Sequence, residues 1–237
     1  MASLDNTAHR HWVERLSVPA YQVAEAARYA RTSVETINNW QRVRGNRVTI
    51  GPRERGKSLS YLQLIELGVV AAMRKSKVKI ERIRDAREYL ADQFGSQSPF
   101  ADYRFKTNGH DLFVSCDQVM TDGDKEKLLV VSKSGQLAWN EILSQLLREF
   151  EYDEQLGKVS VWKVDGLDSP IRIDPRIAFG APQVNGTPTW VLRERWKSGE
   201  SIADIADDYC LEPELVRVAL RFEGVEADPN RPNRWVN

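Results

Sequence analysis

The sequence predicts an α+β protein, and three features of the chain lead to that fold class. Apolar residues recur at helical spacing in the N-terminal third and again over residues 190–222. Short apolar runs between these regions are typical of strands. With 237 residues the chain is about 1.6 times an ordinary domain, so we expect two small domains and a connecting segment.

Two short helices are expected near the N-terminus, the first beginning at Tyr21. The second opens at a capping box, in which the Thr32 hydroxyl would accept from the backbone N–H of Glu35. Two helices across a turn of about three residues predict a helix-turn-helix. The residues of the second helix expected to face inward are Val34, Ile37 and Trp40.

A basic, glycine-rich stretch follows at Arg42–Lys57. Its glycines and proline exclude a helix, and Val48–Ile50 is expected to form one arm of a hairpin. The stretch therefore predicts the basic wing of a winged helix-turn-helix.

Two longer helices are expected after the wing, at Ser58–Met73 and at Lys79–Phe94, the second closing at Gly95. Beyond Pro99 the sequence alternates between strand-like and helical patterns, which predicts a mixed connecting segment. The elements expected there are strands at Leu112–Val114, Leu128–Ser132 and Lys158–Val164, a turn at Asp122-Gly123 and a helix at Leu137–Glu149.

A section rich in proline and glycine begins at Ser169 and runs to Pro188. Within it, Asp174 and Arg176 flank a proline, and we expect a contact that stabilises a turn rather than a catalytic pair. A β-hairpin is expected in this section, and three helices are expected after it. These helices are Trp190–Lys197, Ser201–Asp208 and Pro213–Phe222.

These elements divide the chain into four predicted parts. They are the winged helix-turn-helix at 18–95, the mixed α/β segment at 96–168, the C-terminal hairpin and three-helix domain at 169–225, and a tail at 226–237.

The formal net charge of zero hides an asymmetry between the two ends of the chain. Residues 1–90 carry 17 Lys and Arg against 9 Asp and Glu, a balance of +8. Residues 91–237 carry 17 against 25, a balance of −8. A basic half beside an acidic half indicates that the N-terminal part binds nucleic acid.

Two motifs resemble known families. The stretch from Tyr21 through Thr32 and Trp40 to the wing and Leu59-Ser60-Tyr61-Leu62 resembles a MerR-type winged helix-turn-helix. The run Ile173–Pro182, followed by Asn185–Pro188 and by Gly199–Tyr209, is similar to a small bacterial domain of uncharacterised function.

The combination resembles VapB-type antitoxins of the larger, winged-helix kind. That resemblance implies a PIN-domain ribonuclease toxin as partner and repression of the chain's own operon. Transcriptional MerR proteins have a long dimerising coiled coil after the wing. The short helix at Lys79–Phe94 therefore disfavours a ligand-sensing activator.

Double-stranded DNA is the expected ligand of the N-terminal part. Outward-facing Ser33, Thr36 and Asn39 would contact base edges, because hydroxyl and amide groups can read thymine and adenine. Flanking cations would contact phosphates and fix the register. These cations are Arg42, Arg44, Arg53, Arg55 and Lys57.

The C-terminal helices are expected to bind protein or to dimerise rather than to read DNA. Residues 200–214 contain six carboxylates and no Lys or Arg, and such a surface would repel phosphates. The alternative explanation of the same pattern is an acidic, solvated surface over a small core, with no partner.

The tail provides the candidate toxin contacts. An arginine can satisfy clustered carboxylates of a PIN-type metal site. A frayed terminus is the alternative. The candidate residues are Arg231, Arg234 and Trp235.

No catalytic residues, metal ligands or cofactor are expected, so the chain is not predicted to be an enzyme. The three histidines, His9, His11 and His110, lack partners at metal-ligand spacing. Cys116 and Cys210 are expected to be reduced thiols packed as small apolar side chains. The longest apolar run is too short for a membrane span, and a cytoplasmic location is expected.

The sequence therefore predicts an antitoxin that neutralises a PIN-domain ribonuclease and represses its own operon. We expect a homodimer, because helix-turn-helix proteins gain affinity by reading paired half-sites. The alternative is a stand-alone DNA-binding transcriptional regulator without a toxin. A protein-interaction scaffold is a third possibility if DNA is not bound.

Overall fold

The computed structural model describes residues 12–42, 48–51, 57–102, 105, 144–153 and 155–226. The strands expected near 112–114 and 128–132 and the turn near 122–123 lie outside these residues. The chain divides into two compact units, Met1–Ser160 (unit 1) and Val161–Asn237 (unit 2), which we describe separately. The four-part division expected from the sequence stays a prediction.

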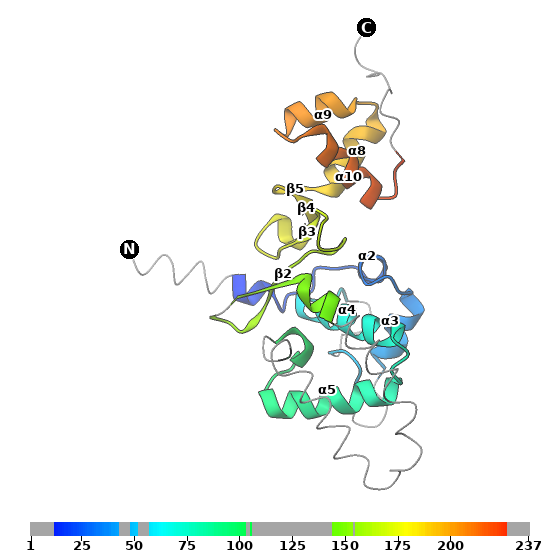
Figure 1. The fold of residues 1–237 in the computed structure, drawn as a ribbon, viewed down its shortest axis with the longest axis vertical. Coiled ribbons are helices and arrows are strands. Elements are labelled where there is room, and N and C mark those ends of the chain that lie inside the picture. The colour runs from blue at the N-terminus through cyan, green and yellow to red at the C-terminus, as the bar shows by residue number, and fades with distance from the viewer. Residues whose placement is uncertain are drawn as a thin grey trace, which may run out of the picture. The chain divides into compact units, whose positions relative to one another are not determined.

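The predicted α+β class is confirmed. N-terminal helices precede a five-stranded antiparallel sheet, and helices follow it (Figure 1). The described helices of unit 1 include α2 (Val23–Tyr29), α3 (Val34–Trp40), α4 (Tyr61–Lys75) and α5 (Ile80–Phe94), with a short 3-10 helix, η1 (Pro99–Ala101). Residues 12–15 are also helical. Part of the helix expected at 137–149 is described, and residues 144–148 are helical.

The centre of unit 1 is α4. It begins at a capping box in which the Ser60 hydroxyl accepts from the Gln63 N–H, while the Gln63 side chain accepts from the Ser60 N–H. The helix is mostly apolar between Tyr61 and Met73, and most of these residues are buried. Its fully buried apolar side chains include Leu64, Ile65, Leu67, Val69, Val70 and Met73.

The predicted helix at 79–94 is confirmed as α5, which packs against α4. Ile83, Ala86 and Leu90 are its buried apolar residues, spaced as in an amphipathic helix. The helix ends at Gly95, whose φ of 57° is left-handed and suits a residue without a side chain.

The start of α3 differs from the prediction by one residue. The N-cap is Ser33, whose hydroxyl accepts from the Thr36 N–H at 3.1 Å, so Thr32 is not the cap. Ile37 and Trp40 are buried as expected, but Val34 is 41% exposed. The inward position predicted for Val34, the first residue of α3, was therefore wrong.

The expected hairpin arm at 48–50 was also wrong, because the described residues 48–51 contain no strand. Thr49 and Ile50 are instead buried in unit 1. The Tyr21 and Leu59 backbones form an isolated antiparallel bridge, which holds the start of α2 beside the start of α4.

The sheet runs in the order β1 (Phe150–Asp153), β2 (Lys158–Trp162), β3 (Arg172–Ile173), β4 (Pro182–Val184) and β5 (Thr187–Pro188). The predicted strand at 158–164 is thus confirmed as β2. β4 and β5 form a hairpin, in which Val184 pairs with Thr187. Asn185 and Gly186 both have positive φ, the backbone that a tight Asn-Gly hairpin turn requires.

The three predicted C-terminal helices are confirmed as α8 (Thr189–Ser198), α9 (Ile202–Asp208) and α10 (Pro213–Phe222). α10 packs against both α8 and α9. Their shared core contains Leu192, Trp196, Ile205, Leu211, Val216 and Leu220.

A buried ion pair joins α4 to α5. Glu66 is fully buried, and its two carboxylate oxygens each lie 3.2 Å from a guanidinium nitrogen of Arg87. Burial raises the pKa of Glu66 above its ordinary value, while Arg87 and a backbone N–H from Gly51 act in the opposite direction. The charge of Glu66 is therefore tolerated only with both partners present.

We predict that Arg87→Leu destabilises the protein by about 3–5 kcal/mol at pH 8, because an unpaired carboxylate stays buried. The pKa of Glu66 is raised in the folded protein. At pH values between its unfolded and folded pKa, the folded protein therefore binds more protons than the unfolded chain. The free energy of unfolding then falls as the pH rises through that range. Urea unfolding should show that Arg87→Leu loses less free energy of unfolding at pH 5 than at pH 8.

The control is the double variant Glu66→Gln/Arg87→Leu, which carries no buried charge and keeps an acceptor for Gly51. It should regain part of the lost stability and lose the extra pH dependence. An Arg87→Leu loss of equal size at both pH values would contradict the role of the Glu66 charge.

Candidate nucleic-acid interface

The helices α2 and α3 form a two-helix corner in unit 1. Four residues, Ala30–Ser33, separate them, and the helices pack against each other. Arg31 in the turn has a φ of 52°, and the Thr32 N–H donates to the Ala27 carbonyl at 2.9 Å. A left-handed residue that closes the first helix redirects the chain sharply into α3.

The predicted base-reading residues lie on or beside the outer part of α3. Ser33 is exposed, while Thr36 and Asn39 are half-buried. The Ser33 and Thr36 hydroxyl oxygens lie 2.8 Å apart and hydrogen-bond to each other. These hydroxyls already have a local partner, so reading a base with either one requires sharing or exchanging that bond.

Three further residues of α3 face outward that sequence reasoning missed. Val34, Glu35 and Asn38 are all exposed, and Glu35 brings a negative charge to this face. An apolar side chain can contact the thymine methyl group, and an asparagine can pair with adenine. By contrast, the side-chain amide atoms of Gln41 are buried and make no hydrogen bond among the described residues.

Only part of the predicted basic wing is described. Arg42 and Lys57, at its two ends, are exposed. Arg44, Arg53 and Arg55 lie outside the described residues, as do the predicted toxin contacts Arg231, Arg234 and Trp235.

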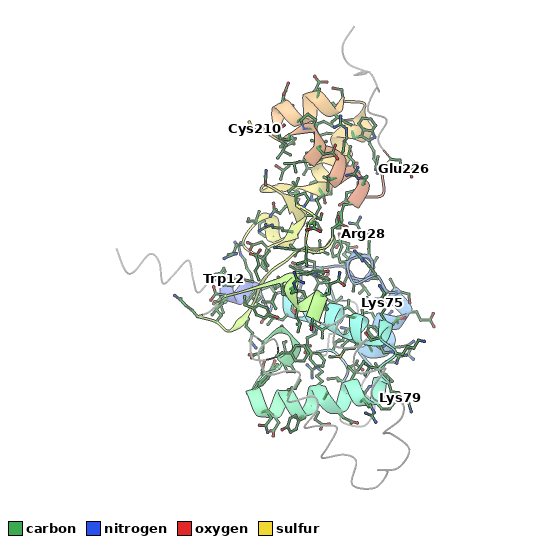
Figure 2. All side chains as sticks on the ribbon, in the orientation of Figure 1. Trp12, Arg28, Lys75, Lys79, Cys210 and Glu226 are labelled. Carbon is green, nitrogen blue, oxygen red and sulfur yellow. The ribbon has the colours of Figure 1, made fainter. Side chains whose placement is uncertain are left out.

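Additional exposed cations of unit 1 come from the turn between α4 and α5. In the view of Figure 2, Lys75 and Lys79 lie toward the edge of unit 1 at which Figure 1 draws α3. The exposed cations at this turn are Arg74, Lys75, Lys77 and Lys79, and Arg28 and Arg31 are exposed at the α2–α3 corner. They extend the positive charge beyond the predicted wing.

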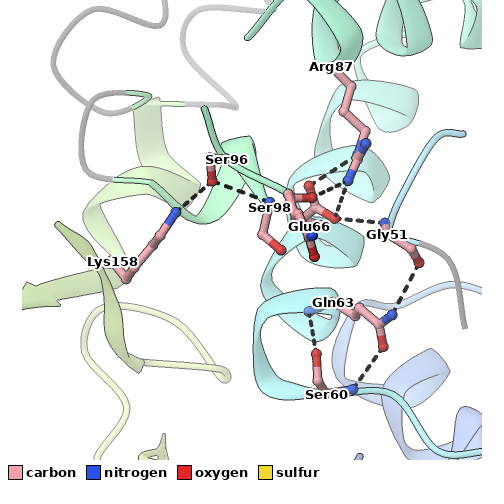
Figure 3. Close-up of polar contacts among 9 residues, drawn as sticks. Gly51, Ser60, Gln63, Glu66, Arg87, Ser96, Ser98 and Lys158 are labelled. Atoms are coloured by element: carbon pink, nitrogen blue, oxygen red, sulfur yellow. Dashed lines mark hydrogen bonds and ion pairs between the residues drawn. The ribbon is translucent and has the colours of Figure 1, made fainter. Parts of the chain in front are cut away.

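The segment 48–51, near the middle of the predicted wing, is tied to three helices. The Thr49 N–H donates to the carbonyl of Trp40 at the end of α3, and the Thr49 hydroxyl accepts from Arg84 of α5 at 2.9 Å. The Gly51 N–H donates to Glu66 at 2.8 Å, and the Gly51 carbonyl accepts from Gln63 at 3.2 Å (Figure 3). Figure 3 also shows Arg87 on the far side of Glu66.

Unit 2 contains a second two-helix corner of the same local geometry. Cys210 in its turn has a φ of 51°, and the Leu211 N–H donates to the Ala206 carbonyl at 2.9 Å. Cys210 is an exposed free thiol, so the expectation that it packs as a small apolar side chain was wrong. Cys116 lies outside the described residues.

The carboxylates of the second corner are partly neutralised by arginines. Arg195 contacts Glu200 and Asp208, and Glu214 contacts Arg217 and Arg221 at 3.2 Å each. This leaves the surface less acidic than the sequence alone indicates. It does not turn the surface basic, because each of these arginines is already paired with a carboxylate.

The loop between β3 and β4 holds an aromatic side chain outward. Phe179 is 81% exposed and has a φ of 55°, between Ala178 and Gly180, which also have positive φ. The predicted contact in this loop is confirmed, since the Asp174 carboxylate accepts from the Arg176 backbone N–H and guanidinium at 2.7–3.1 Å. Trp190 at the start of α8 is 50% exposed.

The part of the chain that the structure describes contains no cluster of His, Cys, Asp or Glu suited to a metal ion. Within those same residues, no helix is both long and apolar enough to cross a bilayer.

Comparison with known proteins supports the resemblances to the small C-terminal domain and to VapB-type antitoxins. Residues 171–222 match a family model described as "Protein of unknown function (DUF433)". Over 227 aligned residues the chain is 26% identical to a Mycobacterium tuberculosis protein named "Putative antitoxin VapB45", covering 87% of this chain and 94% of the relative. The chain is thus similar to this relative over most of its length.

The fold is also found in a solved structure. The crystal structure of Rv2018 from Mycobacterium tuberculosis matches with a TM-score of 0.69 and 22% identity, covering 87% of this chain and 99% of that one. The VapB45 similarity extends far beyond the DUF433 match, so it involves both units rather than the C-terminal domain alone.

We predict that Ser33→Ala lowers the free energy of unfolding by about 1 kcal/mol, because it removes the N-cap of α3. Thr32→Ala is the matched control and should cost clearly less, since the Thr32 side chain does not cap this helix. Chemical denaturation of both variants measures the difference. A larger loss of unfolding free energy for Thr32→Ala than for Ser33→Ala would show that Thr32 caps α3, as the sequence predicts.

Proposed function

We propose that this protein is a DNA-binding antitoxin that neutralises a PIN-domain ribonuclease and represses its own operon. The observation that carries the proposal is the similarity to VapB45, a relative named as an antitoxin, over 87% of the chain. No catalytic role for the chain itself is proposed.

DNA binding is assigned to unit 1 as a helix-turn-helix followed by a basic stretch. Supporting this are the α2–α3 corner, the outward polar face of α3 and the exposed cations on both sides of it. α3 would enter the major groove with Ser33, Thr36 and Asn39 near base edges. Val34 and Asn38 join this set because they are exposed on the same helix.

Phosphate contacts are assigned to cations around α3. The wing would contribute Arg42, Arg44, Arg53, Arg55 and Lys57, and the α4–α5 turn would contribute Lys75 and its neighbours. A homodimer would place two copies of α3 on paired half-sites.

Toxin binding is assigned to the C-terminal part. The tail residues Arg231, Arg234 and Trp235 remain the proposed contacts, with an arginine occupying the acidic metal site of the toxin. Phe179 and Trp190 are further candidates, because exposed aromatic side chains often supply much of the energy of an interface.

The alternative is a DNA-binding regulator without a toxin. A native pull-down of the tagged chain after nuclease treatment, followed by mass spectrometry, separates the two. A near-stoichiometric PIN-domain protein supports the antitoxin. Retention on promoter DNA in an untreated sample, with no protein partner, would leave only the regulator.

We predict that Arg42→Ala reduces the slope of log affinity against log salt by about 1 unit, because one phosphate contact is lost. Fluorescence anisotropy with the chain's own promoter fragment at several salt concentrations measures this slope. Arg221→Ala, an exposed arginine of unit 2, is the control and should leave the slope unchanged. Equal slopes for wild type and Arg42→Ala would remove Arg42 from the interface.

We predict that truncation after Asp228 abolishes inhibition of the toxin and leaves promoter binding intact, because the proposed toxin contacts follow that residue. Ribonuclease assays with increasing antitoxin, beside anisotropy on the promoter, test both halves of the prediction. Inhibition as strong as that of the full chain would exclude the tail and direct attention to Phe179 and Trp190.

A further inference from the structure

The buried carboxylate of Glu66 does more than pair with Arg87. Its Oε2 atom accepts the Gly51 N–H at 2.8 Å and also lies 3.2 Å from Arg87 Nη2. Its Oε1 atom lies 3.2 Å from Arg87 Nε. One side chain of α4 thus holds both a guanidinium from α5 and the backbone of the segment 48–51.

Neighbouring contacts fix the same segment from other directions. Gln63, one turn before Glu66 on α4, donates to the Gly51 carbonyl, and the Ser60 N–H in turn donates to Gln63 (Figure 3). Arg84, one turn before Arg87 on α5, donates to the Thr49 hydroxyl. Both peptide groups of Gly51 are therefore held by side chains of α4.

The segment is also joined to the proposed recognition helix. The Thr49 N–H donates to the carbonyl of Trp40, the last residue of α3, at 3.4 Å. Arg42 lies two residues beyond Trp40, and Asn39 lies one residue before it. The hydrogen bond therefore links segment 48–51 to the end of α3, next to Asn39 and two residues before Arg42.

The space around Gly51 shows how closely the segment is fitted. A Cβ atom at this position would lie 3.3 Å from Glu66 Oε2 and 3.5 Å from Gln63 Cγ. A side chain at residue 51 would therefore crowd the Glu66 carboxylate and reach van der Waals contact with Gln63. Glycine allows the backbone to approach α4 this closely.

We propose that Glu66 is a positioning residue for DNA binding. It locks segment 48–51 against α4 and α5, and so fixes the end of α3 for its contact with DNA. The proposal rests on the DNA-binding function proposed above. Glu66 itself touches no DNA, but the geometry of the interface depends on it.

The test compares Glu66→Ala and Gly51→Ala with Leu90→Ala in the full chain. Leu90 is buried on α5, and its apolar side chain makes none of the hydrogen bonds that hold segment 48–51. It therefore controls for loss of stability alone. Promoter affinity is measured by anisotropy over a range of salt, at a temperature where urea unfolding shows every variant to be folded.

Glu66→Ala and Gly51→Ala should weaken promoter binding about tenfold and reduce the salt slope by about 1 unit, as for a phosphate contact no longer held in place. Leu90→Ala should bind as wild type does. Glu66→Gln keeps an acceptor for the Gly51 N–H and should recover part of the affinity. Equal affinity of Glu66→Ala and Leu90→Ala overturns the proposal.

Hydrogen exchange without DNA separates this proposal from the function on which it rests. Peptides covering residues 48–51 should lose protection in Glu66→Ala and keep it in Leu90→Ala. Unchanged protection in Glu66→Ala overturns the positioning role, whether or not DNA is bound. If wild type binds no promoter DNA while 48–51 still loses protection, the DNA-binding function fails, and with it the positioning role in DNA binding.

Discussion

Glu66 is a carboxylate buried inside an otherwise apolar helix, and much of unit 1 is arranged around it. A charge in that position is stable only if it is paired and hydrogen-bonded. Arg87 supplies the pairing from α5, and Gly51 supplies a backbone hydrogen bond. Meeting this one requirement joins α4, α5 and the segment 48–51.

The two units share a local geometry and differ in charge. Each contains two helices joined by a turn with one left-handed residue, Arg31 in unit 1 and Cys210 in unit 2. In unit 1 the corner exposes Arg28 and Arg31 beside Glu25 and Glu35, with further exposed cations in the α4–α5 turn. In unit 2 Asp208 of α9 is paired with Arg195, and Glu214 of α10 is paired with Arg217 and Arg221. Local backbone geometry alone therefore does not decide which corner reads DNA, and electrostatics favours unit 1.

Much of the helical architecture could be predicted from the sequence. Gly95 marked the end of α5, and the patterns at 201–208 and 213–222 gave α9 and α10, because capping residues and apolar spacing are local signals. Thr32 and Ser33 compete for the same capping role, and local pattern alone did not rank them. The inward stripe of α3 was predicted in part, since Ile37 and Trp40 are buried while Val34 is exposed.

The contacts between distant segments could not be predicted in the same way. Glu66 looked like one polar position in a helix, because its partners lie 15 and 21 residues away. A signal was nevertheless present, since a carboxylate within an almost continuous apolar helix needs a buried partner, and Arg84 and Arg87 are spaced to face α4. The exposure of Cys210 depends on a turn conformation that its apolar neighbours do not reveal.

The central claim is that one chain reads DNA with unit 1 and leaves unit 2 and the tail for a protein partner. Hydrogen–deuterium exchange of the full chain, with and without its promoter fragment, tests this most directly. The account predicts new protection in α3 and residues 48–51, and unchanged exchange in α9 and α10. Protection confined to α9 and α10 would contradict it and assign DNA reading to the C-terminal corner.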